Sequence, residues 1–161
     1  MKRVSWKYLA GLIDGEGCLD LATTKVNEQF YVQPRLRIGM AVNASFLLEM
    51  CQLNFGGHLE KVRVNDNPNW QDAQTWCLSG YKQAVPILRN VVNHLILKKE
   101  QARLCLWMET NVKGKRLGAE ALKAIREELK LMKRDPHRLS EKAQDRILEI
   151  LSCEAIVGVV E

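Results

Sequence analysis

The segment from Phe30 to Val42 is the clearest strand in the sequence, because apolar and polar side chains alternate along it. A period of two is typical of a β-strand with one face buried and the other exposed. The apolar face carries Phe30, Val32, Leu36, Ile38 and Met40. The opposite face carries Tyr31, Gln33, Arg35 and Arg37, which puts two guanidinium groups and an aromatic ring on one surface. The pattern predicts a sheet with an apolar side and a basic side.

The sequence around this strand predicts helices and further strands with clear boundaries. A helix is expected from Ser5 to Asp14, with Ser5 as N-cap and the glycines at 15 and 17 as its end. Asn43 is expected to cap a second helix that Gly56 and Gly57 end. The remaining expected elements are strands at 18–24, 58–64 and 74–79 and helices at 44–53, 81–94, 97–109, 117–133 and 140–150.

This order of elements predicts one α+β domain over residues 1–161, with helices on one face of an antiparallel sheet. Hydrophobic residues make up 47% of the chain and charges are interspersed, which argues against a disordered protein. No apolar run approaches the roughly 20 residues of a membrane span, and no signal peptide is visible. We therefore expect an intracellular protein without a membrane partner, in a prokaryotic cytoplasm or an organelle interior. The net charge of +5 permits a polyanionic partner.

The five cysteines are scattered and never form a CxxC pair, so the sequence suggests neither a disulfide framework nor a zinc site. They are expected to be small core residues. The three histidines, His58, His94 and His137, show no metal-ligand spacing.

The run from Leu9 to Gly17, LAGLIDGEG, has the residues of a helix that ends in a glycine-flanked acidic pair, Asp14 and Glu16. Small residues at Ala10 and Gly11 let two helices approach closely, and the helix end then presents a carboxylate and a backbone carbonyl. Hard oxygen ligands of this kind suit Mg²⁺. The alternative is an ordinary helix end with two solvated acids.

This nonapeptide closely resembles the signature of the LAGLIDADG homing endonucleases, with Glu16 in place of the more common Asp. Segments 56–59, 76–80 and 95–102 are similar to later landmarks of that family, so the resemblance spans about residues 6–110. It implies an αββαββα core over about 5–110, built on a saddle-like antiparallel sheet with helices on one face. Extra C-terminal helices would occupy about 115–161.

A chain with a single motif resembles the homodimeric members of the family, in which two motif helices pack together. The resemblance implies an enzyme that cuts both strands of a long, nearly palindromic site in double-stranded DNA, encoded within an intron. It implies Mg²⁺ or another divalent cation such as Mn²⁺, and no small-molecule cofactor. The expected dimer interface is Leu9, Ala10, Gly11, Leu12 and Asp14.

The resemblance also assigns catalytic roles. Glu16 would bind the metal together with the carbonyl of Gly15, and Asp14 is either an alternative ligand or a support for the helix end. Lys98 would lie near the scissile phosphate, although spacing alone does not separate it from Lys99. Asn43 is the nearest candidate for an assisting polar residue, beside its expected role as a helix cap.

The polar sheet face is the expected DNA-binding surface, since arginine is well suited to guanine in the major groove. Lys61 and Arg63 are weaker candidates, because they share the sequence parity of Leu59, which would turn toward the core. The other expected DNA-binding residues are Asp20, Ala22, Thr24, Tyr31, Gln33, Arg35, Arg37, Thr75 and Cys77.

Two other classes compete with a nuclease. One is a protein of the same fold that does not cleave, either a maturase assisting RNA splicing or a DNA-binding regulator. The other is a small metabolic enzyme with a Mg²⁺ carboxylate site, for which the sequence has no cofactor-binding loop.

Overall fold

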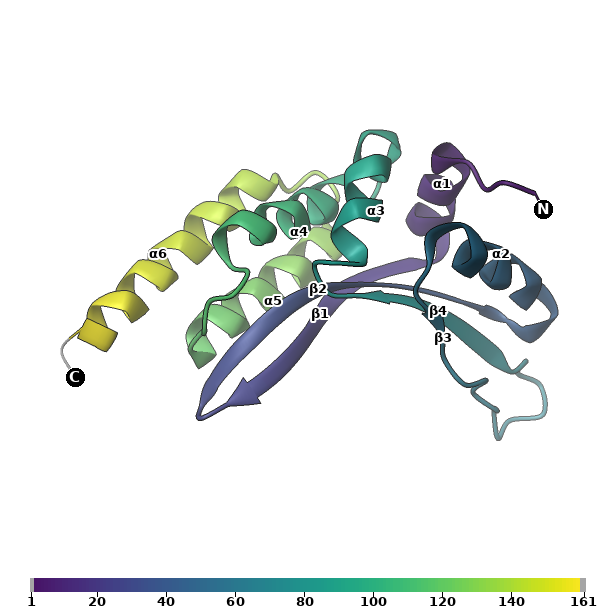
Figure 1. Cartoon of the computed structure of the whole chain (residues 1–161), viewed down its shortest axis with the longest axis horizontal. Helices are drawn as coiled ribbons and strands as arrows, with labels where there is room; N and C mark the ends of the chain where they lie inside the picture. The colour runs from purple at the N-terminus through teal and green to yellow at the C-terminus, as the bar shows by residue number, and fades with distance from the viewer. Residues whose placement is uncertain (1, 160–161) are drawn as a thin grey trace.

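Four strands form one antiparallel sheet in the order β1-β2-β4-β3 in a computed structural model that describes residues 2–159 (Figure 1). The strands are β1 Gly17–Val26, β2 Gln29–Ala41, β3 His58–Leu59 and β4 Ala73–Ser79. The long β1 and β2 curve beneath the helices, and β2 lies between β1 and β4 (Figure 1).

The turn between β1 and β2 sets their register. Asn27 and Glu28 both have positive φ, at 49° and 61°, which is the backbone of a tight two-residue hairpin turn. The register that follows places Gly17 opposite Ile38 and Asp20 opposite Arg35. Because β2 also pairs with β4, Arg35 is flanked by Asp20 and Ser79 in neighbouring strands.

The alternation predicted for the second strand is confirmed. Val32, Leu36 and Ile38 have at most 3% of their surface exposed, and they share their face with Leu19 of β1 and Trp76 of β4. The indole N–H of Trp76 donates to the carbonyl oxygen of Gly56 at 2.8 Å, which satisfies its buried polar atom. This apolar face is the floor of the hydrophobic core.

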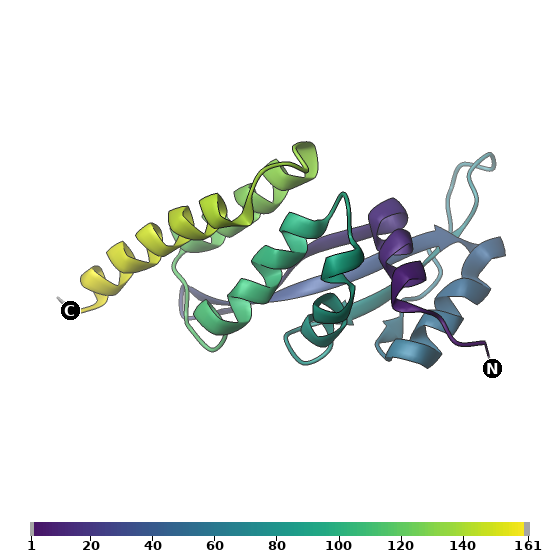
Figure 2. The same ribbon diagram turned by 90° about the horizontal axis from the view of Figure 1, so that it is seen from above.

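Within residues 2–159, six helices pack over the apolar face and over one another (Figure 2). The core falls into two clusters, one under α1, α2 and α3 and the other among α4, α5, α6 and the β1-β2 hairpin. The helices are α1 Trp6–Glu16, α2 Ser45–Phe55, α3 Ala84–Val91, α4 Lys99–Asn111, α5 Ala119–Arg134 and α6 Ser140–Val159, with short 3-10 turns at Val42–Ala44 and Val92–His94.

Ser5 caps α1 as predicted, through its hydroxyl oxygen and the Tyr8 N–H. Asn43 does not cap α2, because it lies inside the 3-10 turn that precedes the helix. The strand expected over 58–64 is reduced to His58–Leu59, since only a single bridge at Arg63 continues the pairing. The helix expected from 81 begins instead at Ala84.

The predicted α+β class, antiparallel sheet and helices on one face are therefore confirmed. Within residues 2–159, no helix is both long enough and apolar enough to cross a lipid bilayer.

Candidate nucleic-acid interface and active site

The end of α1 delivers the second acid of the motif to the surface. Gly15 and Glu16 are both exposed, and the chain turns directly from Glu16 into β1. Gly17 allows this turn, because a Cβ there would lie 2.6 Å from the Ile13 carbonyl oxygen. The side chain of Glu16 makes no hydrogen bond or ion pair with any residue of the described chain.

Asp14, the first acid of the motif, is occupied within the chain. Its carboxylate accepts hydrogen bonds from the backbone N–H groups of Ile96, Leu97 and Lys98, at 2.7, 3.1 and 3.0 Å. These N–H groups belong to the three residues that directly precede α4, near the positive end of its dipole, which favours a carboxylate. Asp14 therefore joins the end of α1 to the start of α4, as the interpretation of a helix-end support predicted.

Lys98 completes this junction. Its ammonium group donates to the backbone carbonyl oxygen of Asp14 at 2.7 Å, whereas Lys99 makes no such bond to α1. In the last turn of α1, the carbonyl oxygen of Ile13 accepts the Gly17 N–H and that of Asp14 accepts Lys98. The carbonyl that follows them along the helix is that of Gly15. The structure thus brings Lys98, Gly15 and Glu16 to the same end of α1.

The outer face of α1 differs from the predicted interface. Leu9 and Ala10 have no exposed surface, because they face the chain's own core, so their assignment to a dimer interface is wrong. Consecutive helical residues are about 100° apart, so Gly11 lies on a different side from Ala10 and is exposed. A Cβ added at Gly11 or Gly15 would meet nothing within 4 Å.

Apolar side chains flank this open glycine surface. Tyr8 is 52% exposed on α1, and Ile96 and Leu97 are 80% and 51% exposed just before α4. Leu12 is half-buried beside them, and the carboxylate of Asp14 is used inside the chain rather than at the surface. The sequence analysis does not identify Tyr8, Ile96 or Leu97 as part of this surface. The one available signal is that Tyr8 precedes Leu12 by four residues, which puts both on the same face of a helix.

The polar face of the sheet points away from the helices (Figure 1). Directly opposed residues of antiparallel strands share a face, so the register identifies its members. Nine predicted DNA-binding residues lie on it: Asp20, Ala22, Thr24, Tyr31, Gln33, Arg35, Arg37, Thr75 and Cys77.

Asp20 organises the two arginines of the polar face. Its carboxylate accepts two hydrogen bonds from Arg35, at 2.8 and 3.0 Å, and another from Arg37. Burial alone would raise the pKa of Asp20, but the hydrogen bonds and charges of Arg35 and Arg37 outweigh it and hold the pKa below its usual value. The Nε atom of Arg37 is buried without a partner, which leaves one donor of this group unsatisfied.

Cys77 shares this face but is only 2% exposed, so its assignment as a DNA contact is wrong: neighbouring side chains cover it. Burial, together with the nearby Glu60 carboxylate, raises the pKa of its thiol.

Arg63 reaches the polar face despite its sequence parity with Leu59. The pairing shifts by one residue between Leu59, opposite Trp76, and Arg63, opposite Ala73. A bulge of this kind reverses the parity of the residues that follow it. Arg63 therefore shares a face with Thr75, and Lys61 is an exposed residue within the bulged stretch. Asn43 is exposed in the turn after β2 and makes no side-chain hydrogen bond within the described residues.

The hairpin end of the polar face meets a basic loop that sequence reasoning did not connect with it. Arg116, between α4 and α5, donates to the hydroxyl oxygen of Tyr31 at 2.8 Å and lies 5.9 Å from the centre of its ring. Lys113 and Lys115 are exposed in the same loop. No local pattern links these positions, because the contact joins residues 85 apart.

No protein-family model and no curated protein matches the sequence. Solved structures match the fold. The homing endonuclease I-CvuI matches in two DNA complexes, with TM-scores of 0.61 and 0.62 at 19% and 18% identity, over 90% of this chain and 93% of that chain. One complex contains 2 mM Mg and uncleaved DNA, and the other contains 2 mM Ca. The LAGLIDADG meganuclease I-AabMI, bound to uncleaved DNA, matches with a TM-score of 0.54 and 21% identity, over 85% of this chain and 50% of that chain.

Proposed function

We propose that this chain, which has the fold of the LAGLIDADG homing endonucleases, is a site-specific DNA endonuclease. It cuts both strands of a long, nearly palindromic DNA site by metal-dependent hydrolysis, acts as a homodimer, and is encoded within an intron. The observation that carries the proposal is the end of α1. There the exposed carboxylate of Glu16, which has no partner among residues 2–159, lies at the same end of α1 as the Lys98 ammonium group, directly before β1.

The donors at this end fit a hard divalent cation. Glu16 offers a carboxylate and Gly15 a backbone carbonyl, and Mg²⁺ prefers oxygen ligands of this kind. When bound, Mg²⁺ would polarise the phosphodiester and make a bound water a stronger nucleophile. Mn²⁺ could replace it on the same ligands. Glu16 holds the ion through its charge, and Asp14 fixes the helix end that presents Glu16.

Lys98 has a second role in the proposal. Its ammonium group is held by the Asp14 carbonyl oxygen at 2.7 Å, so it has a defined position and keeps two further N–H donors. Those donors are available to a phosphate oxygen or to solvent near it. Asn43 remains a candidate assisting residue, because its amide is exposed and uncommitted.

The homodimer is proposed from the outer face of α1. Gly11 and Gly15 provide a flat strip on which a second helix backbone can approach closely, and Tyr8, Leu12, Ile96 and Leu97 provide apolar surface around it. A two-fold axis through this strip would bring the Glu16 of each subunit to a common site. Each carboxylate would then serve one DNA strand.

Gly11→Val tests this interface. The added side chain meets open space in the single subunit, so the variant should fold normally. In the dimer it would hold the two helices apart, and sedimentation should show at least about a tenfold weaker association. Ala119→Val adds the same kind of bulk at an exposed position of α5 and is the control. A Gly11→Val protein that associates like the wild type would place the interface elsewhere.

Cleavage itself is tested on supercoiled DNA that carries the intron-insertion site, reconstructed by joining the flanking exons. We expect linear product with Mg²⁺ and none with a chelator. Tight binding without cleavage in any divalent cation would instead assign the chain to the regulators or maturases. Binding to the spliced or unspliced RNA would then distinguish those two.

A further inference from the structure

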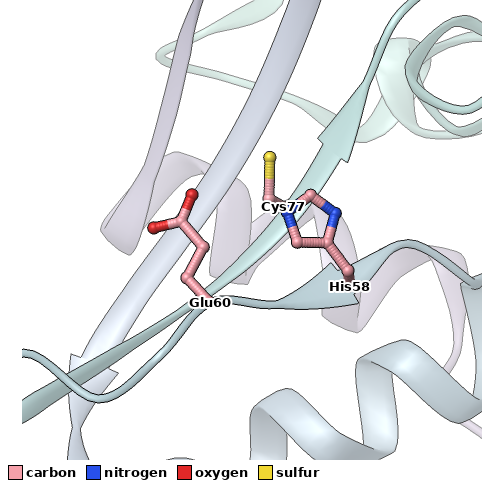
Figure 3. A group of neighbouring side chains, drawn as sticks. All are labelled: His58, Glu60 and Cys77. Carbon is pink, nitrogen blue, oxygen red and sulfur yellow. The ribbon is translucent and has the colours of Figure 1, made fainter.

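Three ligand-type side chains meet on the polar face at the β3-β4 end of the sheet. His58 lies directly opposite Cys77 in the β3-β4 ladder, and Glu60 follows two residues later with its N–H bonded to the Thr75 carbonyl oxygen at 2.8 Å. An imidazole nitrogen, a carboxylate oxygen and the thiol sulfur all lie within 4.8 Å of one another. Figure 3 shows the His58 ring and the Glu60 carboxylate on either side of the Cys77 sulfur.

These three side chains have no other partner in the part of the chain that the structure describes. Among residues 2–159, no hydrogen bond or ion pair reaches the His58 ring, the Glu60 carboxylate or the Cys77 thiol. This contrasts with Asp20, whose carboxylate bonds to two arginines on the same face. Cys77 is 2% exposed, His58 is exposed and Glu60 is intermediate, so the sulfur forms the floor of a site that is open to solvent at the ring.

We propose that His58, Glu60 and Cys77 bind a zinc-class divalent transition-metal ion, with a fourth position open toward the DNA-binding surface. Nitrogen, oxygen and sulfur ligands together suit Zn²⁺, and three protein ligands with one open position are a common arrangement for it. Tetrahedral bonds to such an ion need ligand atoms about 3.3–3.7 Å apart, so the three side chains must close by about 1 Å. Rotamer adjustment at the exposed His58 and Glu60 can supply that movement.

The backbone already supports this arrangement. Gly57, next to His58, has φ +79°, and a Cβ there would lie 2.5 Å from the Cys77 carbonyl oxygen. The glycine thus allows the chain before β3 to approach Cys77 closely. β3 itself pairs through only two residues, so an ion shared by both strands would fasten it to β4.

Binding changes the charge of the polar face. The Cys77 thiol releases its proton to solvent as the metal–sulfur bond forms, so the three side chains and the ion together become neutral, where the metal-free cluster carries one negative charge. Arg37 pairs with Cys77 in the strand register and lies on the same surface. Metal binding therefore removes a net negative charge beside the arginines that are proposed to read DNA, and DNA affinity should rise.

Sequence spacing could not reveal this site. His58 and Cys77 are 19 residues apart, and only the β3-β4 register brings them together. The sequence pattern indicates no metal site, so the proposal rests on this geometry alone.

The test is titration of the purified full chain, without DNA, by Co²⁺ as a spectroscopic probe for Zn²⁺. We expect a thiolate-to-cobalt charge-transfer band at one equivalent, its displacement by Zn²⁺, and a rise in Tm with Zn²⁺ that is lost in Cys77→Ser. Cys77→Ser should abolish the band. His58→Gln and Glu60→Gln should each weaken Co²⁺ binding at least about tenfold, since even loss of a supporting residue costs that much.

Two controls separate this site from others. Cys18→Ser removes the other cysteine of the polar face, and Glu16→Gln removes the proposed Mg²⁺ ligand; neither should change the charge-transfer band. The wild type showing no band, or a band that survives in Cys77→Ser, would overturn the proposal. If Cys77→Ser does not fold, His58→Gln decides, because His58 is exposed and its replacement leaves the core intact. The measurement needs no cleavage, so its outcome is independent of the nuclease proposal.

Discussion

The end of α1 and the paired strands β1 and β2 both combine acids with bases, but they use them differently. On the strands, the Asp20 carboxylate bonds directly to both Arg35 and Arg37, and the group keeps a net positive charge. At the helix end, Asp14 bonds to backbone N–H groups and Lys98 to a backbone carbonyl, which leaves Glu16 without a partner. Three residues separate Glu16 from Asp20, yet of these two acids only Glu16 keeps its carboxylate available for a ligand.

This difference shows that the partner of a carboxylate, rather than its residue type, decides its role. A carboxylate that is bonded by two guanidinium groups orients them and has little capacity left for a cation. An unpaired one at the surface can bind a hard metal ion at no cost in broken ion pairs. The comparison therefore makes separate predictions for Glu16, Asp14 and Asp20.

The largest expected effect is that of the substitution Glu16→Gln on DNA cleavage. The change removes the ligand charge and keeps the side-chain volume, so cleavage in Mg²⁺ should fall by at least about 100-fold. DNA binding and the free energy of unfolding should stay close to those of the wild type, because the Glu16 side chain has no partner among residues 2–159. Glu49→Gln on the exposed face of α2 is the control. Cleavage within about tenfold of the wild type would remove Glu16 from the metal site.

Asp14→Asn should lower the free energy of unfolding, whereas Glu16→Gln should leave it unchanged. The carboxylate accepts three backbone N–H bonds, and an amide keeps only one acceptor oxygen. Hydrogen bonds to a charged group contribute about 1.5–3 kcal/mol, so we expect a loss of about 2–3 kcal/mol in the free energy of unfolding. Urea denaturation measures it, with Glu16→Gln as the comparison. Equal stability of the two variants would contradict the separate roles of the two acids.

The arrangement of β1 and β2 was largely predictable, because alternation identifies faces without any knowledge of the fold. The Asp20–Arg35 pair was predictable in principle, since a two-residue turn at Asn27 and Glu28 makes these two positions opposite each other. The sequence signal was ambiguous, because the whole polar stretch from 25 to 29 could form the turn.

Other features depend on contacts between distant segments. Asp14 meets Lys98 because the 3-10 turn Val92–His94 and the residues after it lie against α1, and no local pattern encodes that junction. β3 ends after Leu59 because a bulge shifts its pairing with β4 before Arg63, and Val62 and Val64, which continue the alternation in the sequence, are exposed. Leu9 and Ala10 were assigned to an interface because the motif was treated as one stripe, whereas the core covers one side of it.

The next effect concerns how DNA affinity divides between the arginines and the basic loop. Arg35→Ala or Arg37→Ala should cost about 1–3 kcal/mol on the cognate site and relax preference at one base position per half-site. Lys113→Ala and Lys115→Ala are the controls, expected to weaken cognate and random DNA alike and to reduce the salt dependence by about one unit per lost contact. Binding to cognate and singly substituted duplexes at several salt concentrations separates the two patterns. If both arginine variants weaken every duplex equally, the polar face does not read bases.

The smallest expected effect is that of Asp20→Asn, and its dependence on pH is the diagnostic feature. The side chains of Asp20 and Arg35 are 23% and 30% exposed, so solvent screens the pair and we expect a loss of about 1–2 kcal/mol near neutral pH. The arginines lower the pKa of Asp20 in the folded protein below the value of 3.8 for an ordinary aspartate. A group whose pKa is lower in the folded state stabilises it above the unfolded pKa, and this contribution is lost as the pH falls through the folded pKa. The difference in unfolding free energy between the wild type and Asp20→Asn should therefore be constant above about pH 5 and shrink below about pH 4.

Glu28→Gln, which loses only an exposed pair with Lys25, serves as the control and should show almost no difference at any pH. A difference for Asp20→Asn that persists unchanged into acid would mean that shape, and not charge, is what Asp20 contributes to the polar face.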